Sequence, residues 1–154
     1  MIALIQRVSE ASVAIDGNEI ARIGPGLLIL LGVHVDDTGS NAEWLARKCS
    51  ALRVFRDDAD ALNRSVVDID GEALVVSQFT LYGDTTRGNR PSFVDAARPE
   101  HAEPLYELFT RQLSEHLGKP VATGRFGAMM DVALVNDGPV TVWIEREPRT
   151  QAGV

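Results

Sequence analysis

The stretch "GLLILLGVHV", residues 26–35, is the sequence feature that most limits the folds open to this chain. Its apolar run from Leu27 to Leu31 is far shorter than the about 20 residues that a membrane-spanning helix needs. A short continuous apolar run is typical of a strand that is covered on both faces. The run therefore predicts a central strand of a soluble protein that has no membrane partner.

The N-terminal segment and the composition favour a cytoplasmic location. "MIALIQRVSEAS" lacks the basic segment followed by an apolar segment that marks a signal peptide. The 154 residues suit one domain, and the single cysteine, Cys49, cannot form an internal disulfide. Because Cys49 lies in a helical pattern beside apolar residues, we expect a buried structural thiol rather than a nucleophile. The net charge of −7 disfavours general nucleic-acid binding but leaves room for recognition of one RNA end.

Turn and helix signals divide the first half of the chain. Asp16-Gly17 lies between two alternating segments and predicts a β-hairpin. Ser40 and Glu43 form a capping box, which predicts that a helix covers about residues 41–52. The segment "LRVFRD" that follows is expected to be a short strand.

The second half combines a further hairpin, a polar loop and a second helix. The hairpin is expected to turn at Asp70-Gly71, residues 83–93 form the loop, and the helix begins at Pro99. "VATGRFGAMMDVALV" and "VTVWIE" are strand-like segments joined by "NDGP". Many strands and two helices predict a single α+β domain over residues 1–145, with helices covering curved, mixed sheets in β/β/α layers. The tail, residues 146–154, is expected to be disordered.

Familiar catalytic and metal-binding patterns are missing from the sequence. The histidines fall in separate segments, where surface roles are favoured: His34, His101 and His116. Three unusual stretches remain, "SQFTL", "GRFGAMM" and "NDGPVT", and each alone has an ordinary structural explanation. In the first stretch, polar Ser77 and Gln78 interrupt an apolar strand, and alternation predicts that Ser77 and Thr80 lie on opposite faces.

Together and in this order, the three stretches resemble the D-aminoacyl-tRNA deacylase family. The resemblance extends from Met1 to about Glu145 and includes "LIQRVSEASV", "GLLILLGV", "NRSVVD", "SQFTLYGDT", "RGNRPSF", "GRFGAMM" and "NDGPVT". It implies a proofreading homodimer that binds the 3′ end of aminoacyl-tRNA and hydrolyses the ester of D-aminoacyl-tRNA. Glycine misloaded on tRNA for alanine is a second implied substrate.

The resemblance also implies the residues of the site. By this resemblance, the pocket wall, with its catalytic main chain, is formed by Ser77, Gln78, Phe79 and Thr80. Gly138 and Pro139, joined by a cis bond, form the loop that enters the partner's site and excludes L side chains, and Arg7 supports this loop. Phe126 and Met130 pack on the terminal adenine. Arg87 and Arg90 are candidates for contact with RNA phosphate, although exposed arginines often have no such role.

Two schemes for the hydrolysis stay open. Thr80 could act as a nucleophile, but the sequence shows no base beside it. Alternatively, the vicinal ribose hydroxyl of the RNA could assist, while the protein orients the ester and offers main-chain N–H groups to the oxyanion. We favour the second scheme, which needs no metal and no organic cofactor. The alternative to an enzyme is a non-catalytic module that binds an RNA end or a protein.

Overall fold

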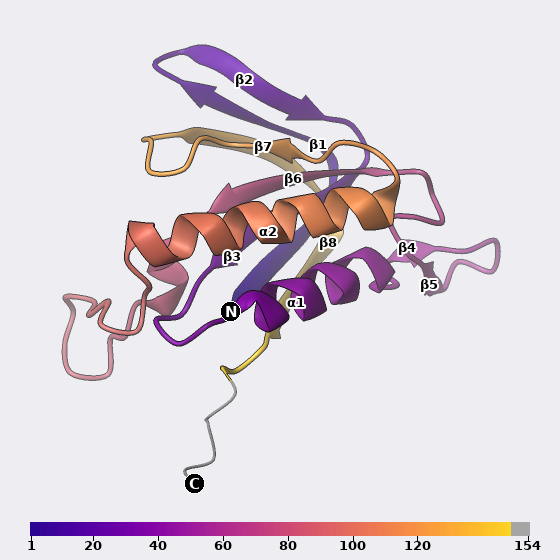
Figure 1. Ribbon diagram of the computed structural model, residues 1–154. Coiled ribbons are helices and arrows are strands. Elements are labelled where there is room, and N and C mark those ends of the chain that lie inside the picture. The colour runs from indigo at the N-terminus through magenta and orange to yellow at the C-terminus, as the bar shows by residue number, and fades with distance from the viewer. Residues whose placement is uncertain (149–154) are drawn as a thin grey trace, which may run out of the picture.

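The computed structural model describes residues 1–148. Its elements are β1 Ile2–Ile15, β2 Asn18–Ile23, β3 Gly26–Gly32, α1 Gly39–Ala51, β4 Phe55–Arg56, β5 Leu62–Arg64, β6 Glu72–Ser77, the 3-10 helix η1 Phe79–Tyr82, α2 Pro99–Leu117, β7 Ala122–Thr123 and β8 Asp131–Glu145. Figure 1 shows α1 and α2 packed on one side of a mixed sheet. The predicted α+β class is confirmed, and a second, two-stranded sheet joins β4 to β5.

The apolar run forms the central strand that it predicts. β3 pairs antiparallel with β1 and parallel with β6, in the strand order β2-β1-β3-β6-β7, while β8 pairs with β1. Leu27, Ile29 and Leu31 belong to the main core, which includes residues of both helices. Leu28 points to the other face, into a second cluster with residues of β1, β2 and β6. Apolar cover on both faces explains why this strand has no alternating pattern.

Of the two hairpins predicted from Asp-Gly pairs, one is present. β1 and β2 are antiparallel, and Asp16-Gly17 turns between them with positive φ at both residues. The hairpin predicted at Asp70-Gly71 is wrong, because β6 pairs parallel with β3 and β7 instead. Residues 65–70 form turns in which the Asp68 carboxylate accepts hydrogen bonds from the N–H and hydroxyl of Ser65. These local side-chain bonds compete with strand pairing before the turn.

Helix α1 begins two residues earlier than predicted and has a different cap. Its N-cap is Thr38, whose N–H donates to Asn41 Oδ1 at 3.1 Å, so the capping box predicted from Ser40 and Glu43 is wrong. Asn41 fills the third helical position, where a short amide side chain performs the same reciprocal bond as Glu or Gln. Helix α2 begins at Pro99 as predicted and ends at Leu117, and its C-cap Gly118 has a left-handed φ of 69°.

The end of the chain differs from the two strands that were predicted around "NDGP". Residues 124–130 are a loop between β7 and β8, and β8 is one strand of 15 residues that pairs with β1. The short strand predicted in "LRVFRD" is confirmed as β4. Of the tail expected to be disordered, residues 149–154 lie outside the described residues. Neither α1 nor α2, the long helices within residues 1–148, is long and apolar enough to span a bilayer.

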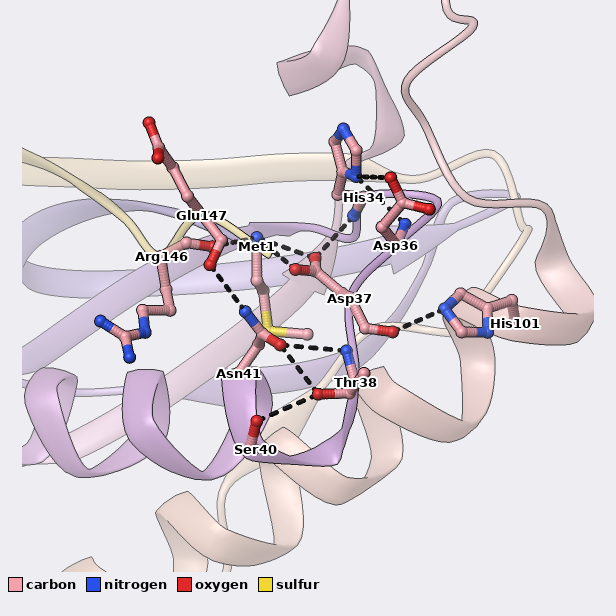
Figure 2. Close-up of polar contacts among 10 residues, drawn as sticks. All are labelled: Met1, His34, Asp36, Asp37, Thr38, Ser40, Asn41, His101, Arg146 and Glu147. Atoms are coloured by element: carbon pink, nitrogen blue, oxygen red, sulfur yellow. Dashed lines mark hydrogen bonds and ion pairs between the residues drawn. The ribbon is translucent and has the colours of Figure 1, made fainter. Parts of the chain in front are cut away.

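A buried polar cluster connects the start of β1 with three other parts of the fold (Figure 2). The Met1 α-ammonium contacts the Asp37 carboxylate at 2.8 Å and donates to the Arg146 carbonyl at 2.7 Å. Asp37 Oδ2 also accepts the His34 N–H at 2.7 Å, and the Asp37 carbonyl is 2.8 Å from His101 Nε2. The cluster therefore ties β1 to the loop before α1, to α2 and to the segment after β8.

Candidate functional site

A cavity of about 520 Å³ opens where β6 ends, beside the first turns of α2 and the loop between β7 and β8. Its lining residues are Val33, Val76, Ser77, Gln78, Phe79, Ala97, Pro99, Ala102, Phe126, Gly127, Ala128, Met129, Met130 and Val132. Ser77 and Gln78 are the only members of this lining with polar side chains. A mostly apolar wall with a few polar groups is the usual character of a small-molecule site.

The polar pair sits at the point where the chain leaves the sheet. β6 pairs with β3 as far as Ser77, and the Gln78 N–H donates to the Leu31 carbonyl at 2.8 Å. The chain then turns into η1, so the prediction that Ser77 and Thr80 lie on opposite faces of one strand is wrong. The ring of Phe79 packs edge-on against Phe93, with centroids 5.0 Å apart. Phe93 belongs to the segment between η1 and α2.

Thr80 differs from the other three residues predicted in the pocket wall. It is exposed and does not line the cavity, whereas Ser77, Gln78 and Phe79 do. Gln78 Nε2 donates a hydrogen bond to the Thr80 hydroxyl oxygen. An amide is not a base, so this contact orients the hydroxyl without activating it.

Phe126 and Met130 come from the loop between β7 and β8 and lie in the same cavity as Ser77. The Phe126 ring is 5.8 Å from the ring of Tyr106 on α2. Met130 packs so closely on Gly124 that a Cβ there would come within 2.6 Å of its sulfur. Both positions lie in this loop, although the sequence predicted them on a strand.

Sequence reasoning missed the part of the cavity that α2 and its preceding segment supply. Ala97, Pro99 and Ala102 were not predicted as site residues, because small apolar side chains give no signal of a site. Tyr106, which does not line the cavity but contacts Phe126, was also missed. Its hydroxyl donates to the Val75 carbonyl at 3.0 Å, and burial raises the pKa of this phenol to about 12, so it stays a donor that ties α2 to β6.

The Gly138-Pro139 loop projects from β8 opposite Arg7. Gln6 pairs with Thr141 and Val8 with Asn136, so residues 137–140 bulge out of the strand. Arg7 Nε donates to the Asp137 carbonyl at 2.8 Å, and Arg7 Nη1 donates to the Val54 carbonyl at 2.8 Å. The Gly138-Pro139 peptide bond is cis, and Gly138 has a φ of 143°.

The loop and the cavity do not meet within one chain. Gly138 and Pro139 are exposed, and neither lines the cavity. The structure thus brings together Ser77, Gln78, Phe79, Phe126 and Met130, whereas the loop and its support stand apart. Beside the loop, β8 leaves apolar side chains open to solvent, namely Leu134, Val135 and Trp143.

The sequence matches the family described as D-Tyr-tRNA(Tyr) deacylase over residues 4–145. A protein named D-aminoacyl-tRNA deacylase from Salinibacter ruber is 61% identical, over 95% of this chain and 97% of its own length. One from Roseiflexus castenholzii is also 61% identical, over 98% of each chain. The fold resembles the solved structure titled c-Myc DNA Unwinding Element Binding Protein, with a TM-score of 0.91 and 42% identity, over 96% of this chain and 99% of that one.

Proposed function

Because the chain belongs to the D-Tyr-tRNA(Tyr) deacylase family, we propose that it hydrolyses the ester of D-aminoacyl-tRNA to the free D-amino acid and tRNA. The observation that carries this proposal is the apolar cavity with two polar side chains, Ser77 and Gln78. The family's characteristic stretches "SQFTL" and "GRFGAMM" are 43 residues or more apart in sequence, yet both contribute residues to this cavity. Such a cavity can hold the aminoacyl group beside the terminal adenosine.

The terminal adenine is proposed to pack on Phe126 and Met130. An aromatic face and a polarizable thioether suit a flat base, and stacking of a base on an aromatic ring contributes about 1–3 kcal/mol. This anchor sets the ester beside the turn from Ser77 to Thr80. Arg87 and Arg90 lie exposed in the loop of residues 83–93, where contact with RNA phosphate is proposed.

Hydrolysis is proposed to depend on the RNA for activation. The Thr80 hydroxyl accepts a hydrogen bond from an amide and has no base among its hydrogen-bond partners in the described residues, which supports a positioning role. Water attacks the carbonyl carbon with help from the vicinal ribose hydroxyl, the ester C–O bond breaks, and the departing ribose oxygen takes a proton. The main-chain N–H groups near Phe79 and Thr80 stabilise the negative charge on the carbonyl oxygen.

Chirality is proposed to be read by a Gly138-Pro139 loop that comes from a second copy of the chain. The loop is exposed and does not line its own cavity, and the apolar side chains of β8 beside it suit an interface. An isologous homodimer places each loop in the partner's cavity, so both sites are completed at once. Main-chain oxygens of the loop leave room for hydrogen on the α-carbon and exclude an L side chain. Glycine is then accepted too, including glycine on tRNA for alanine.

The test of the activity is release of free amino acid from D-tyrosyl-, L-tyrosyl- and glycyl-tRNA by the purified protein. We expect rapid release from the D and glycyl substrates and slow release from the L substrate. Binding of tRNA without release would instead support a non-catalytic module that recognises an RNA end.

The test of the shared site is complementation between two inactive variants. Phe126→Ala damages the cavity, and Gly138→Ala damages the loop, since a Cβ there lies 2.9 Å from the Val140 nitrogen at a φ that disfavours L residues. In a mixed dimer with sites formed across subunits, one site carries both changes and the other carries neither. Random pairing then restores about a quarter of the sites. Sites formed within one chain would give no recovery.

A further inference from the structure

The loop at Gly138-Pro139 is held on a second side by polar side chains that the family resemblance did not assign. Gln6 Oε1 accepts a hydrogen bond from Thr141 Oγ1 at 2.6 Å and another from Asn136 Nδ2. Asn136 Oδ1 in turn accepts the Val140 N–H at 2.9 Å. Asn136 and Thr141 are the residues where β8 leaves and rejoins its pairing with β1. The three side chains therefore close the base of the loop.

Arg7 and Gln6 reach the loop from opposite faces of β1, because successive side chains of a strand alternate. The Arg7 side chain is 6% exposed and holds the Asp137 carbonyl from within the core. The Gln6, Asn136 and Thr141 bonds lie on the part-exposed face. A loop fixed from one face alone could still rotate about its two ends. Contacts on both faces remove that freedom.

We propose that Gln6 is a positioning residue for discrimination between D- and L-aminoacyl-tRNA, acting through Asn136 and Thr141 on the Gly138-Pro139 loop. The proposal rests on the proposed function, in which the loop excludes L side chains. The loop can exclude L side chains only if it stays in place, since a shift of about 1 Å in a positioned group can change a rate by about 100-fold. Gln6 contributes only an acceptor oxygen, so a carboxylate at this position can replace it.

The experiment compares Gln6→Leu with Gln6→Glu. Gln6→Leu removes the acceptor for both bonds, and we expect the ratio of D to L deacylation rates to fall on the order of tenfold to 100-fold. Gln6→Glu keeps an acceptor oxygen, and we expect it to retain most of the ratio. The matched control is Gln112→Leu on α2, where the lost amide bonds Glu115 alone among residues 1–148, and the ratio should not change.

A second readout follows the loop without catalysis. Hydrogen exchange at the Val140 N–H should become faster in Gln6→Leu, because Asn136 loses its bond to Gln6 and is left with the longer bond, 3.5 Å, to Thr141 Oγ1. A folded Gln6→Leu protein with the wild-type ratio and wild-type exchange would overturn the inference and leave the deacylase activity standing. Failure of wild-type protein to release any D-amino acid would overturn the proposed function instead. The exchange measurement would still test whether Gln6 holds the loop through Asn136.

Discussion

Replacement of Asp37 by Asn should destabilise the protein strongly, although Asp37 is far from any predicted site residue in sequence. Both Met1 and Asp37 have side chains with 0% exposure, and both carboxylate oxygens lie 2.8 Å from the Met1 nitrogen. Asn has nearly the same shape but no charge, and its amide group is a donor beside the His34 N–H. The substitution therefore leaves a buried ammonium without its counter-charge.

The magnitude follows from the partners that remain. Removing one member of a buried ion pair costs about 3–5 kcal/mol. The Arg146 carbonyl still accepts from Met1 at 2.7 Å, so we expect the lower end, about 3 kcal/mol. For a chain of this size, each kcal/mol lowers Tm by about 2–4 °C, which gives a fall of about 6–12 °C.

Urea unfolding of the wild type and Asp37→Asn measures this loss, with Asp36→Asn as the control. The Asp36 side chain is 76% exposed, and its nearest ion-pair contact, His34 Nδ1, is as far as 3.8 Å away. Asp36→Asn should therefore change the free energy of unfolding by no more than about 0.5 kcal/mol. Burial lowers the pKa of the Met1 amine and Asp37 raises it, so the variant amine loses its proton more readily when folded. The unfolded variant then binds more protons, and its deficit should shrink between about pH 6 and pH 9. A loss below about 1 kcal/mol at pH 6 would refute the reasoning.

Three further predictions concern residues outside the proposed site. Gly26→Ala should lower the free energy of unfolding by more than about 3 kcal/mol, because the added Cβ would lie 1.9 Å from the Glu72 carbonyl oxygen. In the control Gly24→Ala, the added Cβ would lie 3.4 Å from its nearest atom, Glu72 Oε2, so stability should change by less than about 1 kcal/mol. Tyr82→Phe should stabilise by about 1 kcal/mol in urea unfolding, since the buried hydroxyl has no partner among the described residues, and a loss of stability would reveal one. Cys49 should react with Ellman's reagent at pH 8 only as fast as the protein unfolds, because burial raises the pKa of this thiol to about 12; immediate labelling would contradict this.

Local sequence signals predicted those parts of the fold that depend on neighbours in the chain. The apolar run at β3, the Asp16-Gly17 turn and the helix that begins at Pro99 each carry their own pattern, and all three are present. The buried thiol at Cys49 is confirmed for the same reason, since helical spacing decides which side faces the core. The capping-box error at Ser40 and Glu43 was local, but the error at Asp70-Gly71 arose where a distant partner decides. There β6 pairs in parallel with β3, and sequence patterns do not specify the partner of a buried strand.

The cavity was predicted in part, and the missing part has a physical cause. Polar Ser77 and Gln78 gave a signal because they interrupt an apolar strand. Phe126 and Met130 gave one only through the resemblance, since large apolar residues are usually core. The contribution of α2 gave none, because alanine and proline carry no chemistry of their own. The contact between Gln6 and Asn136 spans 130 residues and depends on the register of β1 against β8, which no local pattern contains.

That register also explains how a small protein can present a fixed loop without a large insertion. Residues 137–140 stand opposite the single residue Arg7, while Gln6 and Val8 on either side keep their partners on β8. The ends of the loop are thus held by the same ladder that closes the sheet, and closing so short a segment costs little chain entropy. The buried arginine then supplies the support that a loop of four residues cannot build from its own side chains. In the proposed function, in which this loop excludes L side chains in a second chain, the rigidity of the loop comes from the core of the first chain.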